Sequence, residues 1–173
     1  KEALQKLADA GVLTYHHNLE SSRRFYPNVC TSHSYDDRIN TIKNAKAVGL
    51  DVCSGGIFGL GETIEDRIDM ALDLRALEIH SVPINVLTPI PGTPFENNEE
   101  VNPFEILKTI SIYRFILPKA FLRYCGGRIK LGEHAKTGLR CGINSALTGN
   151  FLTTTGTTIE TDKKMIKELG YEI

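Results

Sequence analysis

Short apolar runs alternate with helical patterns along the whole chain. The strand-like runs are VLTYHHN, LDVCSGG, SVPINVLT, KAFLRYCGG and INSALTG. Between them lie segments with helical periodicity, such as YDDRINTIKNAKAVG and TIEDRIDMALDLRAL. This alternation is typical of parallel β/α units, because a connection between parallel strands needs a long crossover. We therefore predict an α/β fold with parallel strands, either a (β/α) barrel or a doubly wound sheet.

Several helix boundaries carry recognisable signals. Gly49 stands where a helical pattern stops, and Thr63 and Asp66 have the spacing of a capping box. Pro103 suits the first position of the helix FEILKTISIYRFIL. A short helix at HAKTGLRCG and a final amphipathic helix at TDKKMIKELG complete the expected order.

Composition limits the class of protein. The 173 residues are 41% hydrophobic and 24% charged, with a formal net charge of −1, so we expect one globular domain over 1–173. No basic block suggests a nucleic-acid partner, and no apolar run approaches the ~18 residues of a membrane span. The four cysteines contain no C-x-x-C pair, which argues against a disulfide framework or a zinc site and favours the cytoplasm. The chain starts within a helical pattern and without Met, so we expect the C-terminal piece of a longer protein.

Chemically versatile side chains follow the predicted strands. In parallel α/β folds, functional residues gather at the carboxyl ends of strands. Pure packing would favour Val, Ile and Leu there. The side chains expected at this rim are Tyr15, His17, Asn18, Glu20, Cys53, Asn85, Arg123 and Cys125.

Each candidate also has a purely structural interpretation. Cys53 is a small apolar residue in many cores, although Gly55 and Gly56 after it would let the backbone approach a ligand closely. Arg123, if buried, needs either an ion pair with Glu20 or a neighbouring Asp, or a bound anion.

The remaining polar residues are equally open. Asn18 and Asn85 could serve turns, although Asn85 lies inside a continuing strand. Arg38 is a helix-surface residue unless its turn lies under the rim. His16 and His17 face opposite ways on a strand, so at most one joins a site. We expect Cys30 to be a bystander, Cys141 to serve packing, and Thr153–Thr155 to form a turn or a small-ligand contact.

Several segments together resemble the biotin synthase family. VCSGGIFGLGET is similar to its CSGGIvGLGE segment, and SVPINVLTPIPGTP to SVPINxLxPxxGTP. YHHNLESS resembles YNHNLDTS, TSHSYDDRINTI resembles TTRTYxxRLxT, YCGGR takes the place of an LSAGR-like segment, and GINSALTGNFLTT resembles GANSxFxGxxLLTT. The resemblance covers nearly the whole chain, with its motifs in the same order.

The resemblance implies a radical S-adenosylmethionine (SAM) enzyme on a (β/α)8 TIM-type barrel. This chain would be its C-terminal part, with the biotin/thiamin-synthesis-associated region at about 80–173. The implied reaction is sulfur insertion into dethiobiotin to make biotin. Implied cofactors are SAM, a [4Fe–4S] cluster with ligands upstream of this chain, and an auxiliary [2Fe–2S] cluster that supplies the sulfur. A flavodoxin- or ferredoxin-type reductant and a homodimer are expected from the family alone.

Matched residue by residue, the resemblance makes Cys53 and Arg123 ligands of the auxiliary cluster. The residues that match contacts to SAM, its nucleotide or the substrate region are Asn18, Glu20, Arg38, Gly55, Gly56, Ile57 and Asn85. A soft thiolate suits iron–sulfur ligation, and amides suit ribose hydroxyls and a ureido group.

The departures from the family pattern are specific. The C-x-x-x-C-x-x-C motif and two further auxiliary-cluster cysteines are absent, so we expect this piece alone to be inactive and to behave poorly. Glu20 replaces an Asp and His16 replaces an Asn. Cys125 is additional, and we hypothesise that it ligates the auxiliary cluster and changes its nuclearity.

Three alternatives remain at this point. The first is another radical SAM enzyme with the same C-terminal region, of the hydrogenase-cofactor maturase or methylornithine synthase type. The second is a small-molecule-binding barrel fragment without redox chemistry. The third, a phosphate-binding barrel that uses GIFGLGE, has no evident acid–base pair to support it.

Overall fold

The computed structural model describes residues 1–150 and 156–172. Its strands form one sheet in the order β1-β2-β4-β5-β6, and β3 lies off this path and pairs with β4. Every pairing is parallel, which confirms the predicted α/β class. The strands are β1 (Thr14–His16), β2 (Asp51–Cys53), β3 (Gly56–Phe58), β4 (Ser81–Val86), β5 (Phe121–Tyr124) and β6 (Ser145–Ala146).

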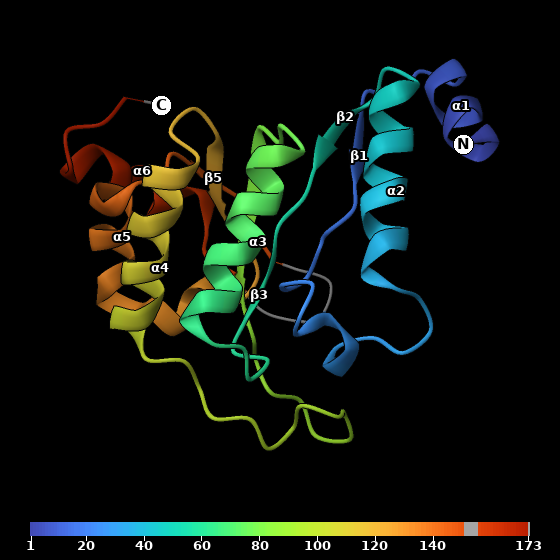
Figure 1. Cartoon of the computed structure of the whole chain (residues 1–173). Coiled ribbons are helices and arrows are strands. Elements are labelled where there is room, and N and C mark those ends of the chain that lie inside the picture. The colour runs from blue at the N-terminus through green and yellow to red at the C-terminus, as the bar shows by residue number, and fades with distance from the viewer. Residues whose placement is uncertain (151–155, 173) are drawn as a thin grey trace.

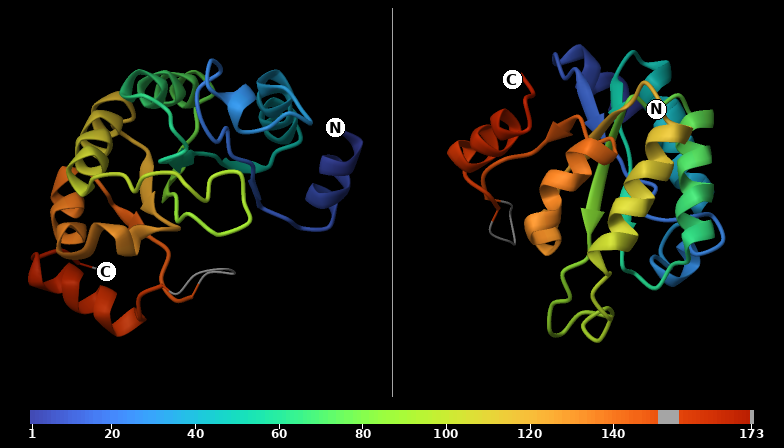
Figure 2. Two further views of the ribbon diagram at one scale, coloured as in Figure 1. Left: turned by 90° about the horizontal axis from the view of Figure 1, so that it is seen from below. Right: turned by 90° about the vertical axis from the view of Figure 1, so that its left-hand side faces the viewer.

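Helices cover one side of this sheet. They are α1 (Glu2–Asp9), α2 (Tyr35–Ala47), α3 (Ile64–Ala76), α4 (Pro103–Ile116), α5 (Ala135–Cys141) and α6 (Ile159–Glu168), with short 3-10 turns at Tyr26–Asn28 and Arg128–His134. Figure 1 shows the strands running between these helices, and in Figure 2, seen from below, α2 to α5 form an arc around the strands. The sheet therefore has a helix-covered outer side and an inner side.

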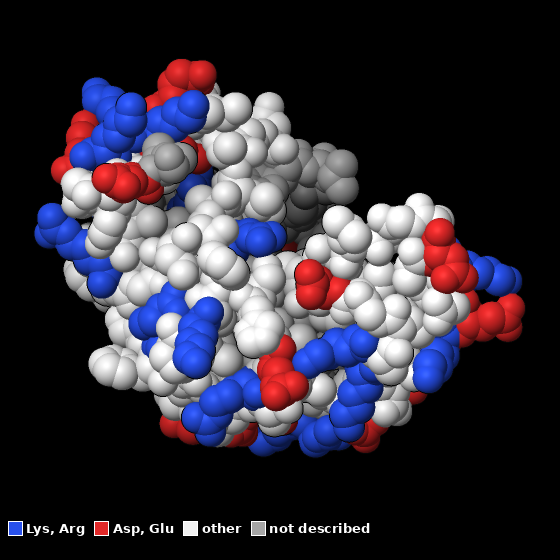
Figure 3. All heavy atoms as spheres, turned by 90° about the horizontal axis from the view of Figure 1, so that it is seen from above, with Lys and Arg blue, Asp and Glu red and all other residues white. Residues whose placement is uncertain are grey.

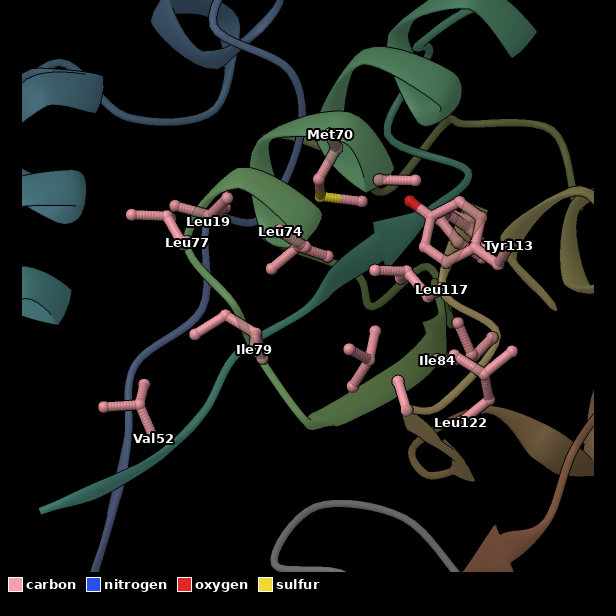
Figure 4. Packing of buried hydrophobic residues seen from close by; sticks show 14 of the residues in the cluster. Leu19, Val52, Met70, Leu74, Leu77, Ile79, Ile84, Tyr113, Leu117 and Leu122 are labelled. Carbon is pink, nitrogen blue, oxygen red and sulfur yellow. The ribbon is translucent and has the colours of Figure 1, made fainter. Parts of the chain in front are cut away.

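The hydrophobic core lies between the sheet and this arc of helices. Alternate strand residues point outward into it, including Val52, Ile84 and Leu122, and meet Leu74 and Tyr113 from the helices (Figure 4). Most of these side chains are almost fully buried, and each contributes about 1.5–3 kcal/mol to folding. Because side chains alternate along a strand, the residues between them face the inner side.

The predicted helix starts are confirmed in detail. Thr63 and Asp66 form the expected capping box at the start of α3. Pro103 is the first residue of α4, after the cap Asn102. Helix α2 begins with a second capping box, between Ser34 and Asp37, which the sequence analysis did not identify.

Three elements differ from the sequence predictions. Strand β3 lies in a glycine-rich segment for which no separate strand was predicted, and the 3-10 turn Arg128–His134 was not expected. Strand β6 has only two residues. Thr153–Thr155 lie outside the described residues, so the expectation for them stays a prediction.

Both signs of charge mix over the surface seen from above in Figure 3, where Lys and Arg alternate with Asp and Glu along the lower edge. None of the helices in the described ranges is long and apolar enough to cross a membrane. Within those ranges β1 and β6 are the two ends of the sheet and do not pair with each other.

Candidate functional site

The strand register brings Cys53 and Arg123 to the same side of the sheet. Cys53 is the partner of Ser81 across the β2–β4 ladder, and Pro83 is the partner of Arg123 across the β4–β5 ladder. Ser81 and Pro83 are two residues apart on one strand and therefore share a face. Val82 and Ile84, which alternate with Ser81 and Pro83 along β4, point outward into the core. Cys53 and Arg123 therefore face the inner side, and only β4 lies between their strands.

Cys53 is enclosed although it faces this inner side. Its exposed fraction is 5%. The hydroxyl Oγ of Ser81 donates a hydrogen bond to its Sγ over 3.4 Å, and His16 is its register partner on β1. A thiol beside a hydroxyl and an imidazole has polar neighbours, which a purely packing cysteine does not require.

Arg123 is half-buried and forms no salt bridge among residues 1–150 and 156–172. The ion pair with Glu20 or an Asp that we considered from the sequence is therefore not formed there. Its positive charge acts on its inner-side neighbours instead. Burial first, and then Arg123, lower the pKa of His16.

Cys125 follows β5 and is buried like Cys53, with an exposed fraction of 5%. Burial raises the pKa of its thiol to about 12, Arg123 opposes this shift and Cys53 adds to it. Cys53 and Arg123 therefore both lie close enough to Cys125 to interact electrostatically with its thiol. Cys125 is thus a neutral thiol at neutral pH, at the inner side as its strand position predicted.

Asn18 joins the end of β1 to the glycine pair. Its Oδ1 accepts a hydrogen bond from the backbone N–H of Gly55 at 3.1 Å, and its Nδ2 donates to Glu20 at 3.3 Å. The side chain is therefore fixed between β1 and the segment after Cys53. One amide N–H and one lone pair remain for another partner.

The glycine pair has a packing role that the sequence analysis did not identify. A Cβ on Gly55 would lie 2.2 Å from the carbonyl oxygen of Pro83, and a Cβ on Gly56 would lie 2.4 Å from that of Glu20. The side chain of Met70 also occupies the space beside Gly56. Both positions thus require glycine for contact between protein segments, whether or not a ligand approaches them.

Asn85 is a bridge between strands and not a turn residue. Its Nδ2 donates to the carbonyl of Gly56 and its Oδ1 accepts from the N–H of Gly126, both at 3.1 Å. Its register partner is Ile57 on β3, which is only partly buried. Asn85 and Ile57 therefore lie together at the end of the sheet that also holds the glycine pair.

Glu20 and Arg38 lie close enough to interact across this end of the sheet. Glu20 adopts a left-handed backbone conformation with φ of 70° and bridges to Gly56. Burial raises the pKa of its carboxyl, against the opposing effects of Arg38 and Asn18. Arg38 is half-buried and donates from Nε to the hydroxyl of Tyr26 at 2.8 Å, so its side chain is not free on the helix surface.

Glu62 has the contacts of a functional residue, although the sequence patterns did not single it out. The carboxylate of Glu62 accepts hydrogen bonds from the N–H groups of Gly59 and Leu60 at 2.8–3.2 Å and pairs with Arg67 at 2.8 Å. The backbone donors that a phosphate would need in GIFGLGE are therefore already occupied, which argues against the phosphate-binding alternative. The signal was a Glu three residues after Gly59 with an Arg five residues further on.

The other candidates lie away from this centre. Cys30 and Cys141 pack partly against the core, as expected for Cys141. The hydrogen bond with the Ser32 hydroxyl is the main cause that lowers the pKa of the Cys30 thiol to about 6. His17 stacks on Tyr15 at 5.9 Å between ring centroids and does not share the face of His16.

The described residues supply only part of a metal-ligand set. No group of three or more His, Cys, Asp or Glu side chains in the described ranges could hold a metal ion. Cys53 offers one soft thiolate, and Arg123 offers nitrogen without a competing carboxylate salt bridge in those ranges. The donor set fits a cluster that takes its remaining ligands from other residues.

Two family models match this chain. Residues 1–74 match the radical SAM superfamily, and residues 83–172 match the Biotin and Thiamin Synthesis associated domain. The model of the associated domain covers more than half of the chain, so the chain belongs to the family that carries this domain, and its first 74 residues match the radical SAM superfamily. Radical SAM proteins use an iron–sulfur cluster and SAM.

The curated relatives carry a more specific name. The chain is 98% identical over all of its 173 residues to the protein named biotin synthase of Fusobacterium nucleatum subsp. nucleatum, of which it covers 48%. It is 60% identical to the biotin synthase of Campylobacter hominis over 99% of its length, which is 53% of that relative. The chain thus spans about half the length of the curated relatives it matches, and the resemblance to biotin synthase is confirmed.

Solved structures show the same fold. The crystal structure of methylornithine synthase matches 99% of this chain and 55% of that one, with a TM-score of 0.79 and 22% identity. That of a maturase of the [FeFe]-hydrogenase matches 98% of this chain and 42% of that one, with a TM-score of 0.77 and 18% identity. At these identities the likeness supports the barrel-type fold and says nothing of substrate.

Proposed function

We propose that the full-length protein inserts sulfur into dethiobiotin to make biotin, and that Cys53 and Arg123 are this chain's ligands to the auxiliary cluster that supplies the sulfur. The observation that carries this proposal is the placement of Cys53 and Arg123 on the inner face, one strand apart, in a chain 98% identical to a biotin synthase. The enzyme would be a sulfurtransferase.

The cofactors would supply the radical chemistry and the sulfur. When bound, SAM and its [4Fe–4S] cluster provide a radical that removes hydrogen from unactivated carbon, and the auxiliary cluster provides sulfur. The chain's own contribution is to hold and orient. Cys53 provides a thiolate with a hydroxyl donor beside it, and Arg123 provides a nitrogen ligand.

The polar residues at the end of the sheet would bind SAM and the substrate. Asn18 and Asn85 are each fixed by protein partners and keep donor and acceptor capacity for ribose hydroxyls or a ureido group. Glu20 and Arg38 would face the nucleoside, and Gly55, Gly56 and Ile57 would lie against it. A preorganised amide loses less freedom on binding than a mobile one.

Cys125 is proposed as an additional cluster ligand. It is buried, close to Cys53 and Arg123, and neutral because burial raises the pKa of its thiol. Iron would have to displace that proton, as metals do when they bind thiols. Mössbauer spectra of the full-length protein that contain only a [2Fe–2S] auxiliary species would overturn this assignment.

The test of the function is direct. The full-length product is purified anaerobically, reconstituted with iron and sulfide, and supplied with dethiobiotin, SAM and a flavodoxin- or ferredoxin-type reductant. We expect a brown protein that forms biotin and that behaves as a homodimer. A brown protein that consumes SAM without forming biotin would instead favour another radical SAM branch, and a colourless one would favour a binding fragment.

The alternatives have less support. The methylornithine synthase and hydrogenase-maturase structures share the fold with this chain at 22% and 18% identity. The relatives at 98% and 60% identity are both named biotin synthase. We therefore do not favour either alternative radical reaction, nor a binding role without redox chemistry.

A further inference from the structure

A buried carboxylate shapes the turn after β3. Glu62 accepts a hydrogen bond from the N–H of Gly59 at 3.0 Å and one from the N–H of Leu60 at 2.8 Å. Gly59 and Gly61 both have a φ of 104°, which only glycine adopts without strain. The turn therefore depends on glycine for its backbone and on Glu62 for its hydrogen bonds.

Arg67 on α3 compensates the charge of this carboxylate. Its Nε donates to Glu62 at 2.8 Å, and the two side chains are only 8% and 2% exposed. Its guanidinium also lies over the ring of Phe58, the last residue of β3, at 5.3 Å from the centroid. Loss of the partner of a buried carboxylate strongly destabilises a protein. Arg67 is therefore needed to keep Glu62 buried against the backbone of this turn.

Helix α4 in turn holds Arg67. The NH1 group of Arg67 donates to the hydroxyl of Thr109 at 3.2 Å, and the hydroxyl of Tyr113 donates to the backbone carbonyl of Arg67 at 2.9 Å. Tyr113 also packs edge-on against Phe58 at 5.7 Å between centroids. These contacts join the region that matches the radical SAM model to the region that matches the associated domain.

We propose that Arg67, held by Thr109, is a positioning residue that fixes Gly56–Phe58 and the turn after it in the conformation that binds SAM. The path is continuous: Thr109 orients Arg67, Arg67 orients Glu62, and Glu62 holds the two N–H groups directly after β3. This inference rests on the proposed function, because it assigns Gly55, Gly56 and Ile57 to SAM binding. It makes the associated domain a support for the cofactor site.

Two matched variants of the full-length protein separate positioning from general stability. Thr109→Val removes the hydroxyl that Arg67 contacts and keeps the shape of the side chain. Ser111→Ala removes a hydroxyl that, like that of Thr109, bonds to the carbonyl four residues earlier in α4. In the described ranges the Ser111 hydroxyl makes no hydrogen bond with Arg67, so this variant controls for loss of a side-chain-to-backbone hydrogen bond within α4.

We expect Thr109→Val to raise the KM and the Kd for SAM by roughly three- to tenfold with little change in kcat, because the lost hydrogen bond acts on SAM only through Arg67 and Glu62 and so only part of its free energy reaches the cofactor. Hydrogen exchange at the amides of Gly59 and Leu60 should become faster in the same variant. Ser111→Ala should change neither quantity. Arg67→Lys should recover part of the SAM affinity that Arg67→Met loses.

The proposal is overturned if Thr109→Val lowers the melting temperature as Ser111→Ala does and leaves both SAM affinity and exchange at Gly59 and Leu60 unchanged. Failure of the proposed function looks different. In that case the parent protein binds no SAM or makes no biotin, while the exchange difference between the two variants persists. If the parent binds SAM and makes biotin, but exchange at Gly59 and Leu60 is the same in Thr109→Val as in the parent, the positioning role alone is refuted.

Discussion

The hydroxyl of Ser81 donates a hydrogen bond to the sulfur of Cys53 over 3.4 Å. The two residues are register partners on adjacent parallel strands and both face the inner side of the sheet. A donor at this distance stabilises negative charge on sulfur, and such hydrogen bonds tune clusters held by cysteine thiolates. Ser81 therefore has an electronic effect on Cys53 in addition to its place in β4.

Ser81→Ala should move the reduction potential of the auxiliary cluster to a more negative value. Loss of the hydroxyl donor removes stabilisation of the more negatively charged, reduced state. The potential is measured by a spectroscopic redox titration of the reconstituted full-length protein, with Ser111→Ala as the control. An unchanged potential in Ser81→Ala would mean that Cys53 does not ligate this cluster.

Gly56→Ala should destabilise the protein by about 2–3 kcal/mol, because the new methyl group must displace the carbonyl of Glu20 and the side chain of Met70. Gly92→Ala is the control, since its Cβ meets nothing within 4 Å and only the φ of 82° opposes it. That variant should lose about 1 kcal/mol. Urea denaturation gives both values, and equal losses would refute the close approach of β3 to Glu20.

Cys30 should be the cysteine that alkylating reagents modify first at low pH. Its pKa is lowered to about 6, mainly by the hydrogen bond with Ser32, so the reactive thiolate already dominates above that pH. Iodoacetamide labelling, followed by peptide mass spectrometry, should rise from about pH 5 to about pH 7 and then level off. Cys125, with its pKa raised to about 12, should stay unlabelled over this range.

Ser32→Ala supplies the control for this prediction. Removal of the hydroxyl should move the labelling midpoint of Cys30 upward, toward the ordinary value of about 8.5 for a free thiol. A Cys30 labelling rate that keeps rising steeply above about pH 8 in the parent would contradict the low pKa.

Asp66→Asn should weaken the attachment of the segment after β1 to α3. The buried carboxylate of Asp66 accepts hydrogen bonds from Ser22 and Arg24, both at 2.5 Å, and caps α3 through Thr63. Its loss should cost about 2 kcal/mol at neutral pH. Asp37→Asn, which breaks the exposed capping box of α2, should cost less.

The same variant should also flatten the acid dependence of stability. Burial raises the pKa of Asp66, but the hydrogen bonds from Ser22 and Thr63 outweigh it, and the net pKa is lowered. The stabilisation is therefore complete above the unfolded value of about 3.9 and disappears as the pH falls through the lower folded value. Thermal unfolding of parent and variant should converge in acid, and a constant difference across pH would contradict this origin.

Local signals were sufficient to predict the helices. Thr63 and Asp66 lie three residues apart in the sequence and need no tertiary partner to form a capping box. Strand β3 was missed for the opposite reason. It is a short glycine-rich segment, and its pairing with β4 and its contact with Glu20 come from distant parts of the chain.

The candidate site was predictable in its residue types but not in its connections. The carboxyl ends of strands predicted where Cys53, Asn85 and Arg123 lie. The hydrogen bond between Asn18 and Gly55 joins residues 37 positions apart, and the hydrogen bond between Arg67 and Thr109 joins residues 42 positions apart. Such pairs depend on how the helices pack on the sheet, which periodicity does not specify.

The central claim is that Cys53 ligates the cluster that supplies sulfur. The most direct measurement compares Cys53→Ala with Cys141→Ala in the anaerobically reconstituted full-length protein, by iron content, Mössbauer spectra and biotin formed from dethiobiotin. We predict that Cys53→Ala keeps the cluster that binds SAM but loses the auxiliary species and all biotin formation, while Cys141→Ala retains both. An auxiliary species and biotin yield that survive in Cys53→Ala would contradict the account.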